Sequence, residues 1–295
     1  MREIYRGAMY LSAAAAIWGG TYVASKYVLD IIPPFTLLFI RYLITSVVLV
    51  MVCWRQNIPV VPRRDKGLLF QVGFVGYFLS ISAQFIGTKL SSAHMGAVIT
   101  TLSPMFQSLF AIWLLKEKIS TVQAAASVIA FSGVMAIIIL PGGGPDEASS
   151  LAGSMVLLLA ALFWGYYSVI SRKASVNVSS LQMTTWGILL ATGFSFVAAF
   201  SEMSAWNLNL LLSWQIVFSL LYLSVIGTAV AFFSWNKGLA LVPSHQAAIF
   251  FFFQPVVGSL LGWALLDEKI TGSFFLGTVL IIGGVYLSMR QPAKV

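Results

Sequence analysis

The chain has 295 residues, of which 59% are hydrophobic and only 9% are charged. Soluble domains carry roughly a quarter charged residues, so this composition excludes a soluble protein and requires a lipid environment. A net charge of +8 would also suit a nucleic-acid-binding protein, but the basic residues gather in short loops between apolar stretches, as membrane topology alone requires. We therefore expect no nucleic-acid partner. The single cysteine, Cys53, excludes a disulfide framework and a CxxC metal or redox site within the chain.

The first apolar stretch, 8–28, follows Arg2 and Arg6 and in this respect resembles a secretory signal peptide. It is too long for a signal peptide, however, and Pro33 and Pro34 follow it without a small-residue cleavage site. We therefore predict that it is retained as the first membrane-spanning segment.

Charged residues, prolines and glycines divide the whole chain into ten apolar stretches. Each is close to the roughly 20 residues that a helix needs to cross the hydrocarbon core. Because backbone polar groups in lipid must be satisfied internally, continuous apolar runs of this length predict helices, whereas barrel strands would be half as long and would alternate in polarity. The predicted helices span 8–28, 35–54, 67–87, 93–115, 121–140, 153–171, 180–200, 214–236, 243–266 and 271–289.

The lysines and arginines are distributed unequally between the two sides of this bundle. Most fall on the side of the N-terminus; only Lys26, Lys89 and Lys269 fall on the other side, and Arg41 lies within a span. The positive-inside rule therefore predicts cytoplasmic N- and C-termini in a multi-pass protein of the inner (cytoplasmic) cell membrane.

The chain repeats itself. At an offset of 146, Trp18 and Gly19 match Trp164 and Gly165, and at an offset of 151 the segment from His94 to Gly133 shares identical residues with the segment from His245 to Gly284. The stretch "PGGGPDEASS", residues 141–150, reads as the joint between the halves. Five spans per half is an odd number, so the second half must enter the membrane in the opposite sense. Residues 1–145 and 146–295 are therefore predicted to be two inverted five-helix repeats, an arrangement typical of transporters.

These features resemble the EamA-type transporters of the drug/metabolite transporter superfamily. The resemblance rests on "WGGTYVASK" in the first span and its echo "WGYYSVISRK", on "PFTLLFIRY" opening the second span, and on "LLKEKIS" and "LLDEKIT" closing the fourth and ninth. It covers nearly the whole chain. It implies a bundle of ten helices around a central cavity, with helices five and ten at the periphery, and export of amino acids or other small metabolites.

Arg41 is the one basic residue well inside a span, about six residues or roughly 9 Å from the outer end of the second helix. A buried arginine is by default a functional residue, although a long side chain near a helix end can instead snorkel to the interface. If Arg41 faces a cavity, its natural partner is a single substrate carboxylate. The matching position in the second half is Gly187, so such a site would be asymmetric.

All nine acidic residues fall in loops or at helix ends. Exporters that exchange protons for cations need a carboxylate inside the membrane, and transporters of multiply charged phosphates need several buried cations, so both classes are disfavoured. A neutral, zwitterionic or singly charged organic solute remains. We interpret Lys116-Glu117-Lys118 and Asp267-Glu268-Lys269 as helix ends and ion pairs.

The spans also carry many aromatic and polar residues, including Thr100, Ser103 and Thr228. Trp18 and Trp164 lie near the middle of their spans, too deep for the interfacial belt, whereas Trp235 and Tyr77 could belong to that belt. Aromatic rings beside glycine suit a cavity wall, and helix packing is the alternative. The predicted substrate-binding residues are Trp18, Thr21, Tyr22, Arg41, Tyr77, Gln84, Thr101, Trp164, Tyr167, Trp186, Asn236 and Gln254.

Gating or coupling is assigned to four residues in the fourth and ninth spans. His94 and His245 lie near the helix starts, where a histidine can relay a proton or simply bond the helix end. Pro104 and Pro255 should kink their helices at matched depths. The four consecutive phenylalanines 250–253 point all around their helix, so we expect no aromatic cage there. Gly258 and Gly262 form a GxxxG pair that indicates close packing first and dimerisation second, so a monomer or weak homodimer is expected.

Together these patterns predict an inner-membrane transporter that exports small metabolites by alternating access, amino acids with apolar or aromatic side chains foremost. Two alternatives stay open: a flippase for a lipid-linked molecule, and an exporter of other neutral, drug-like solutes. An intramembrane enzyme would need paired acids, a metal cluster or an activated nucleophile, and the spans contain no acid and no HExxH motif. We therefore expect no enzyme activity, no metal and no cofactor. The partners are the small-molecule substrate and the lipid bilayer.

Overall fold

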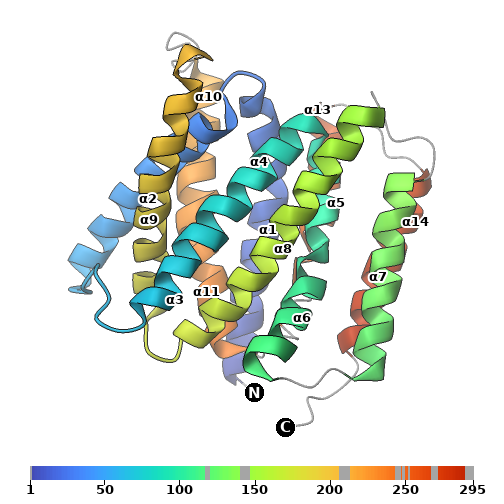
Figure 1. Ribbon diagram of the computed structural model, residues 1–295, viewed down its shortest axis with the longest axis horizontal. Helices are drawn as coiled ribbons and strands as arrows, with labels where there is room; N and C mark the ends of the chain where they lie inside the picture. Colours follow the sequence, from blue (N-terminus) through green and yellow to red (C-terminus); the bar gives the residue numbers. More distant parts are fainter. Residues whose placement is uncertain are drawn as a thin grey trace.

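The computed structural model describes residues 2–116, 120–139, 147–205, 213–242, 247, 250–251, 253–266 and 272–289. In these ranges the regular secondary structure is helical throughout (Figure 1). The elements are α1 (Arg2–Leu29), α2 (Pro34–Arg55), α3 (Lys66–Gln71), η1 (Val72–Leu79), α4 (Ser80–Leu90), α5 (Ala93–Ile99), η2 (Thr100–Leu102), α6 (Ser103–Leu115), α7 (Thr121–Ile139), α8 (Glu147–Ala174), α9 (Ser180–Ala199), η3 (Phe200–Ala205), α10 (Trp214–Leu221), η5 (Tyr222–Val230), α11 (Ala231–Leu241), α13 (Phe253–Leu266) and α14 (Gly272–Met289).

Each of the ten predicted stretches is helical wherever the structure describes it. Two starts differ: α1 begins at Arg2 and α8 at Glu147, both about a turn and a half earlier than predicted, because the polar residues before each apolar run contain no helix-breaking proline. Six helices in the described residues are long and apolar enough to cross a membrane, namely Pro34–Arg55, Lys66–Leu90, Met95–Leu115, Leu151–Ala174, Ser180–Ser204 and Trp214–Leu241. The chain is therefore a multi-pass, all-α membrane protein.

The helices pack as a bundle in which matched helices have matched neighbours. α1 packs on α11 and α13, α8 packs on α4 and α6, and α2 packs on α9. α7 and α14 lie side by side at one edge of the bundle (Figure 1), where the family resemblance places the fifth and tenth helices.

Close helix approach at glycine occurs twice in the same way. A Cβ added to Gly19 would lie 2.6 Å from Val257 of α13, and a Cβ added to Gly165 would lie 2.7 Å from Phe106 of α6. Gly165 is the counterpart of Gly19 at the offset of 146, and Val257 is the counterpart of Phe106 at the offset of 151. Any side chain at either glycine would push the two helices apart, so the halves share one packing solution.

Two π-helices interrupt long helices at matched positions. η1 lies between α3 and α4, and η5 lies between α10 and α11. The offset of 151 carries Val72–Leu79 onto residues 223–230, which η5 contains. π-helices are rare and occur frequently at functional sites, because the wider turn alters which carbonyls the helix itself uses. Sequence periodicity did not predict either of them.

Candidate functional site

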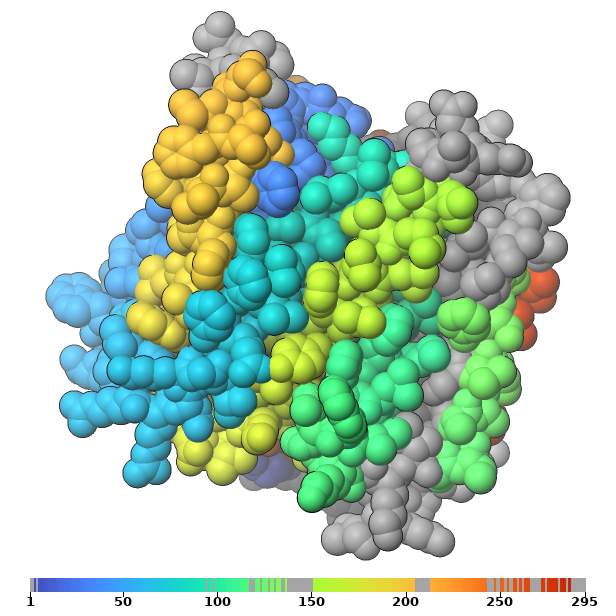
Figure 2. Space-filling model, viewed as in Figure 1, coloured from blue at the N-terminus to red at the C-terminus, as the bar shows by residue number. Residues whose placement is uncertain are grey.

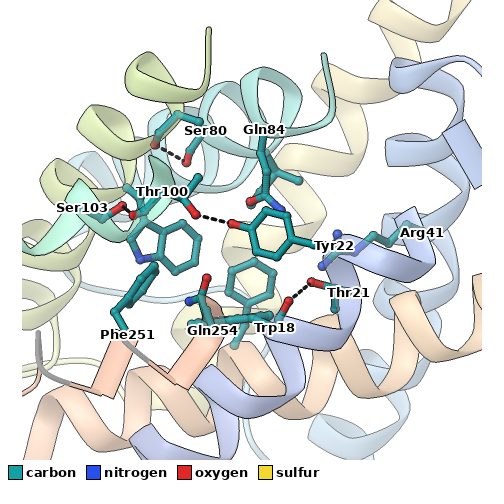
Figure 3. A pocket seen from close by; sticks show the side chains of 14 residues that line it. Trp18, Thr21, Tyr22, Arg41, Ser80, Gln84, Thr100, Ser103, Phe251 and Gln254 are labelled. Carbon is teal, nitrogen blue, oxygen red and sulfur yellow. Dashed lines mark hydrogen bonds between the residues drawn. The ribbon is translucent and has the colours of Figure 1, made fainter. Parts of the chain in front are cut away.

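A central cavity lies between helices of both halves (Figure 3). It contains about 380 Å³ of space not filled by atoms, including space that is open to its surroundings. The inner part has room for only about one or two water molecules. α4 and α8 pack closely side by side on the face drawn in Figure 2. The lining residues are Trp18, Thr21, Tyr22, Arg41, Ser80, Ile81, Gln84, Thr100, Ser103, Ala160, Trp164, Phe232, Phe251 and Gln254.

Arg41 is buried and lines this cavity; it does not snorkel to the interface. Its Nε donates to the Thr228 hydroxyl at 2.5 Å, and a terminal nitrogen donates to the Gly227 carbonyl at 3.2 Å. The guanidinium carbon lies 5.5 Å from the centroid of the Phe85 ring, within the range of a cation–π contact. In the described part of the chain the only ion pair joins Glu3 and Arg6, so Arg41 has no carboxylate partner there.

The π-helix η5 supplies the acceptors that hold this region together. The Gly227 carbonyl accepts a second hydrogen bond from the Trp18 indole nitrogen at 3.0 Å. One turn further along α2, the Thr45 hydroxyl shares its proton between the Arg41 carbonyl at 2.7 Å and the Ser224 carbonyl at 2.8 Å. α1 and α2 are therefore both tied to η5, and these bonds set the place of the guanidinium.

The start of α2 is held by a residue far away in sequence. Pro33 occupies the N-cap and offers no side-chain acceptor. Instead the Glu202 carboxylate of η3 accepts from the backbone nitrogens of Phe35 at 3.1 Å and Thr36 at 2.7 Å, and from the Thr36 hydroxyl at 2.8 Å. A carboxylate at a helix N-terminus is stabilised by the free N–H groups and by the helix dipole. The second half thereby anchors the helix that carries Arg41.

Aromatic rings form one wall of the cavity. The Trp18 ring lies 5.1 Å from Trp164, 5.5 Å from Phe232 and 5.9 Å from Phe251, measured between centroids. Trp235 packs behind them at 5.3 Å from Trp18 and is fully buried. The interfacial-belt interpretation of Trp235 was therefore wrong, and Phe251 does join an aromatic cluster that sequence alone argued against.

The indole nitrogens of the two repeat-related tryptophans differ. Trp18 donates to the Gly227 carbonyl, whereas the buried indole nitrogen of Trp164 has no hydrogen-bond partner among the described residues. The buried indole nitrogen of Trp235, which does not line the cavity, has no partner among the described residues either.

The opposite wall is polar. Ser80, Thr100, Ser103 and the amide of Gln84 lie on one side of the cavity, with Trp18 and Phe251 across from them (Figure 3). The Tyr22 hydroxyl lies 2.5 Å from the Thr100 hydroxyl. Ser80 and Phe251 were not predicted from the sequence as site residues; Thr100 and Ser103 appeared only among the wider set of polar residues in the spans.

Three predicted substrate-binding residues belong instead to a buried polar cluster outside the cavity lining. The Asn236 amide donates to the Tyr77 hydroxyl at 2.9 Å and to Thr184 at 2.8 Å, and its oxygen accepts from Tyr167 and from Ser171, each at 2.7 Å. Tyr77 is fully buried, so the interfacial-belt alternative was wrong for it too. These side chains are satisfied by one another and do not line the cavity.

The remaining predicted residues divide as follows. Thr101 is buried and Trp186 is half-buried, and neither lines the cavity. Pro104 lies in the first turn of α6, directly after the 3-10 segment η2, where the α-helix is interrupted as predicted for a proline. The side chains of His94 and Pro255, and the whole of His245, lie outside the described residues, as do Glu117, Lys118 and the Asp267-Glu268-Lys269 run.

Comparison with known proteins identifies the family of the chain over nearly its whole length. The model of the EamA-like transporter family matches twice, at residues 5–139 and 151–290. An uncharacterized transporter, YetK, of Bacillus subtilis is 29% identical over 290 residues, covering 96% of this chain and 87% of the relative. A probable amino-acid metabolite efflux pump of Escherichia coli is 25% identical, covering 95% of each chain. A protein of known crystal structure aligns with a TM-score of 0.73 at 18% identity, covering 96% of this chain and 95% of that chain. The chain belongs to the EamA-like transporter family.

Proposed function

We propose that the protein exports amino acids with apolar or aromatic side chains from the cytoplasm. The observation that carries this proposal is the cavity itself: one buried cation, Arg41, beside a wall of aromatic rings. A single carboxylate neutralises the guanidinium, whose remaining N–H groups allow a charge-assisted pair. The rings of Trp18, Trp164 and Phe251 then cover an apolar side chain. The relative in Escherichia coli that is described as a probable amino-acid metabolite efflux pump supports both the substrate class and the direction.

The proposed topology has ten spans, arranged as inverted repeats of residues 1–145 and 146–295, with both termini in the cytoplasm. Three observations support it: the two family matches, the matched glycine contacts and the matched π-helices. The distribution of lysines and arginines supports this orientation in the proposed location, the inner membrane.

Alternating access is the proposed mechanism. The described conformation has little free space at its centre, so helices of the two halves must separate before a solute can enter or leave.

Two matched contacts each hold a helix end within one half. The Lys26 ammonium donates to the carbonyls of Thr88, Lys89 and Ser91 at 3.1 to 3.4 Å. Its counterpart at the offset of 146, Arg172, donates to the Val242 carbonyl at 2.6 Å, and Val242 matches Ser91 at the offset of 151. Each cation therefore holds the same helix end in its own half.

The proposal is tested by flux in proteoliposomes with a panel of labelled amino acids. Saturable transport of phenylalanine or leucine, faster than transport of aspartate or lysine, is expected because the cavity carries one positive charge and one aromatic wall. Absence of saturable flux for every amino acid would reject the substrate class. Repeating the assay with an imposed pH gradient determines whether transport is coupled to protons, the role predicted for His94 and His245.

A further inference from the structure

The serine and threonine hydroxyls of the polar wall already donate hydrogen bonds to backbone carbonyls. Ser80 donates to the Ala160 carbonyl at 2.9 Å, Thr100 to the Gly96 carbonyl at 2.7 Å, and Ser103 to the Thr100 carbonyl at 2.6 Å. A hydroxyl has one proton and two lone pairs. Once the proton points at a backbone carbonyl, only lone pairs remain for a guest.

The position of the Thr100 proton also identifies the donor in the hydrogen bond between Tyr22 and Thr100. Because the Thr100 proton is directed at the Gly96 carbonyl, the Tyr22 hydroxyl is the donor across their 2.5 Å contact. On α1, Thr21 likewise donates to the Trp18 carbonyl at 2.7 Å. The four serine and threonine hydroxyls that line the cavity therefore act as acceptors there.

The Gln84 amide adds an acceptor to this wall. No hydrogen bond joins it to another of the described residues, and its side chain lines the cavity beside Ser80 (Figure 3). An amide can present either its oxygen or its nitrogen to a guest. The hydroxyls of Ser80 and Ser103 can only accept in the cavity. If Gln84 presents its amide oxygen, the wall offers three acceptors, from Ser80, Gln84 and Ser103.

We propose that this polar wall of Ser80, Gln84 and Ser103 binds the primary ammonium group of a zwitterionic amino acid whose carboxylate is bound by Arg41. The inference rests on the proposed function and narrows it. A primary ammonium carries three N–H donors, and the described residues that line the cavity include no carboxylate to pair with it. Neutral oxygens with oriented lone pairs replace the missing charge. Acids without the amino group, and ammonium groups without N–H, should therefore be poor ligands.

Binding of three analogues tests this in purified, detergent-solubilised full-length protein, through quenching of tryptophan fluorescence. The analogues are phenylalanine, phenylpropionate, which lacks the ammonium, and the trimethylated betaine of phenylalanine, which lacks N–H donors. We expect phenylalanine to bind at least about tenfold more tightly than either of the others. Equal binding of phenylpropionate would overturn the proposal. Equal binding of the betaine would assign the ammonium to the aromatic faces instead.

A pair of variants on α6 isolates the wall. Ser103→Ala removes one acceptor and should reduce the preference for phenylalanine over phenylpropionate at least about threefold. The control is Ser108→Ala: Ser108 donates to the Pro104 carbonyl at 2.9 Å in the same way but does not line the cavity, and its preference should equal that of the wild type. An unchanged preference in Ser103→Ala would overturn the proposal. Binding is measured without transport, so the two proposals can fail separately. Selective binding without flux would reject the exporter and retain the ammonium site. Flux without selective binding would retain the exporter and reject the ammonium site.

Discussion

Arg41 of α2 and Gly187 of α9 occupy matched positions in the two halves, and their neighbours have diverged in step. Arg41 donates to Thr228 of η5. The counterpart of Thr228 is Tyr77 of η1, and a Cβ added to Gly187 would lie only 2.6 Å from the Tyr77 ring. In the first pair the long side chain of Arg41 faces the short side chain of Thr228. In the second pair Gly187, which has no side chain, faces the large ring of Tyr77.

The residues beside these two pairs also differ between the halves. Phe85, which lies under the Arg41 guanidinium, corresponds to Asn236, which donates to the Tyr77 hydroxyl. Packing between helices is conserved between the halves, while the polar chemistry is not. In the proposed mechanism, shared packing allows the two halves to exchange roles during transport, and unequal chemistry binds an unsymmetrical solute in one orientation.

Removing the charge should have the largest effect. Arg41→Ala is expected to lower kcat/KM for phenylalanine by about 100-fold, close to 3 kcal/mol, because the substrate carboxylate then enters the cavity without a partner. Vesicle flux, normalised to the amount of protein inserted in the membrane, measures this. Arg41→Lys, which retains the charge but not the planar fork of donors, should lie between the two. Wild-type kinetics in Arg41→Ala would show that Arg41 does not bind the substrate carboxylate.

Filling the matched glycine tests the other half. Gly187→Ala places a methyl group against the Tyr77 ring and should destabilise the protein by roughly 1–3 kcal/mol, seen as a lower Tm in detergent. Gly193 lies on the same helix with nothing within 4 Å of an added Cβ, so Gly193→Ala should leave the Tm unchanged or raise it slightly. An equal response of the two variants would mean that the Tyr77 packing is loose.

Removing the distant helix cap should cost less. Glu202→Ala is expected to lower the free energy of unfolding by about 1–2 kcal/mol, because the first N–H groups of α2 lose their acceptor. Thermal unfolding with Asp30→Ala as a control for the loss of one acid measures this; Asp30 is exposed. A further expectation is a raised KM for phenylalanine in Glu202→Ala, since α2 carries Arg41.

The smallest effect concerns the two end contacts. Lys26→Gln and Arg172→Gln each weaken a cation at a helix end, worth roughly 0.3–1 kcal/mol, and should shift access to the cavity in opposite directions. Labelling of a cysteine introduced at Ala160, in a Cys53→Ala background, reports this shift with a membrane-impermeant thiol reagent applied from either side. We expect about threefold faster labelling from outside in Lys26→Gln and from inside in Arg172→Gln. A shift toward the same side in both variants would contradict the matched roles.

The helices were predictable because lipid leaves few choices for apolar stretches of this length, and the duplication could be read from identical residues such as Trp18 and Trp164. Arg41 stood out in the sequence because charge inside a span is rare, but its position alone did not decide between a cavity and the interface. The residues of the Tyr77–Asn236 cluster were predicted to bind substrate but do not line the cavity, since polarity at membrane depth does not reveal whether a group is already satisfied. The π-helices could not be predicted either, because they depend on contacts between segments far apart in the sequence, as does the Glu202 contact with α2.

The most direct test of the asymmetric cavity compares phenylalanine with its carboxamide, which has the same body but no negative charge. In the wild type, kcat/KM for phenylalanine should exceed that for the carboxamide by at least about 30-fold, the value of a charged partner for Arg41. In Arg41→Ala this preference should disappear. The same preference in both proteins would contradict the account, because the carboxylate would then be recognised elsewhere.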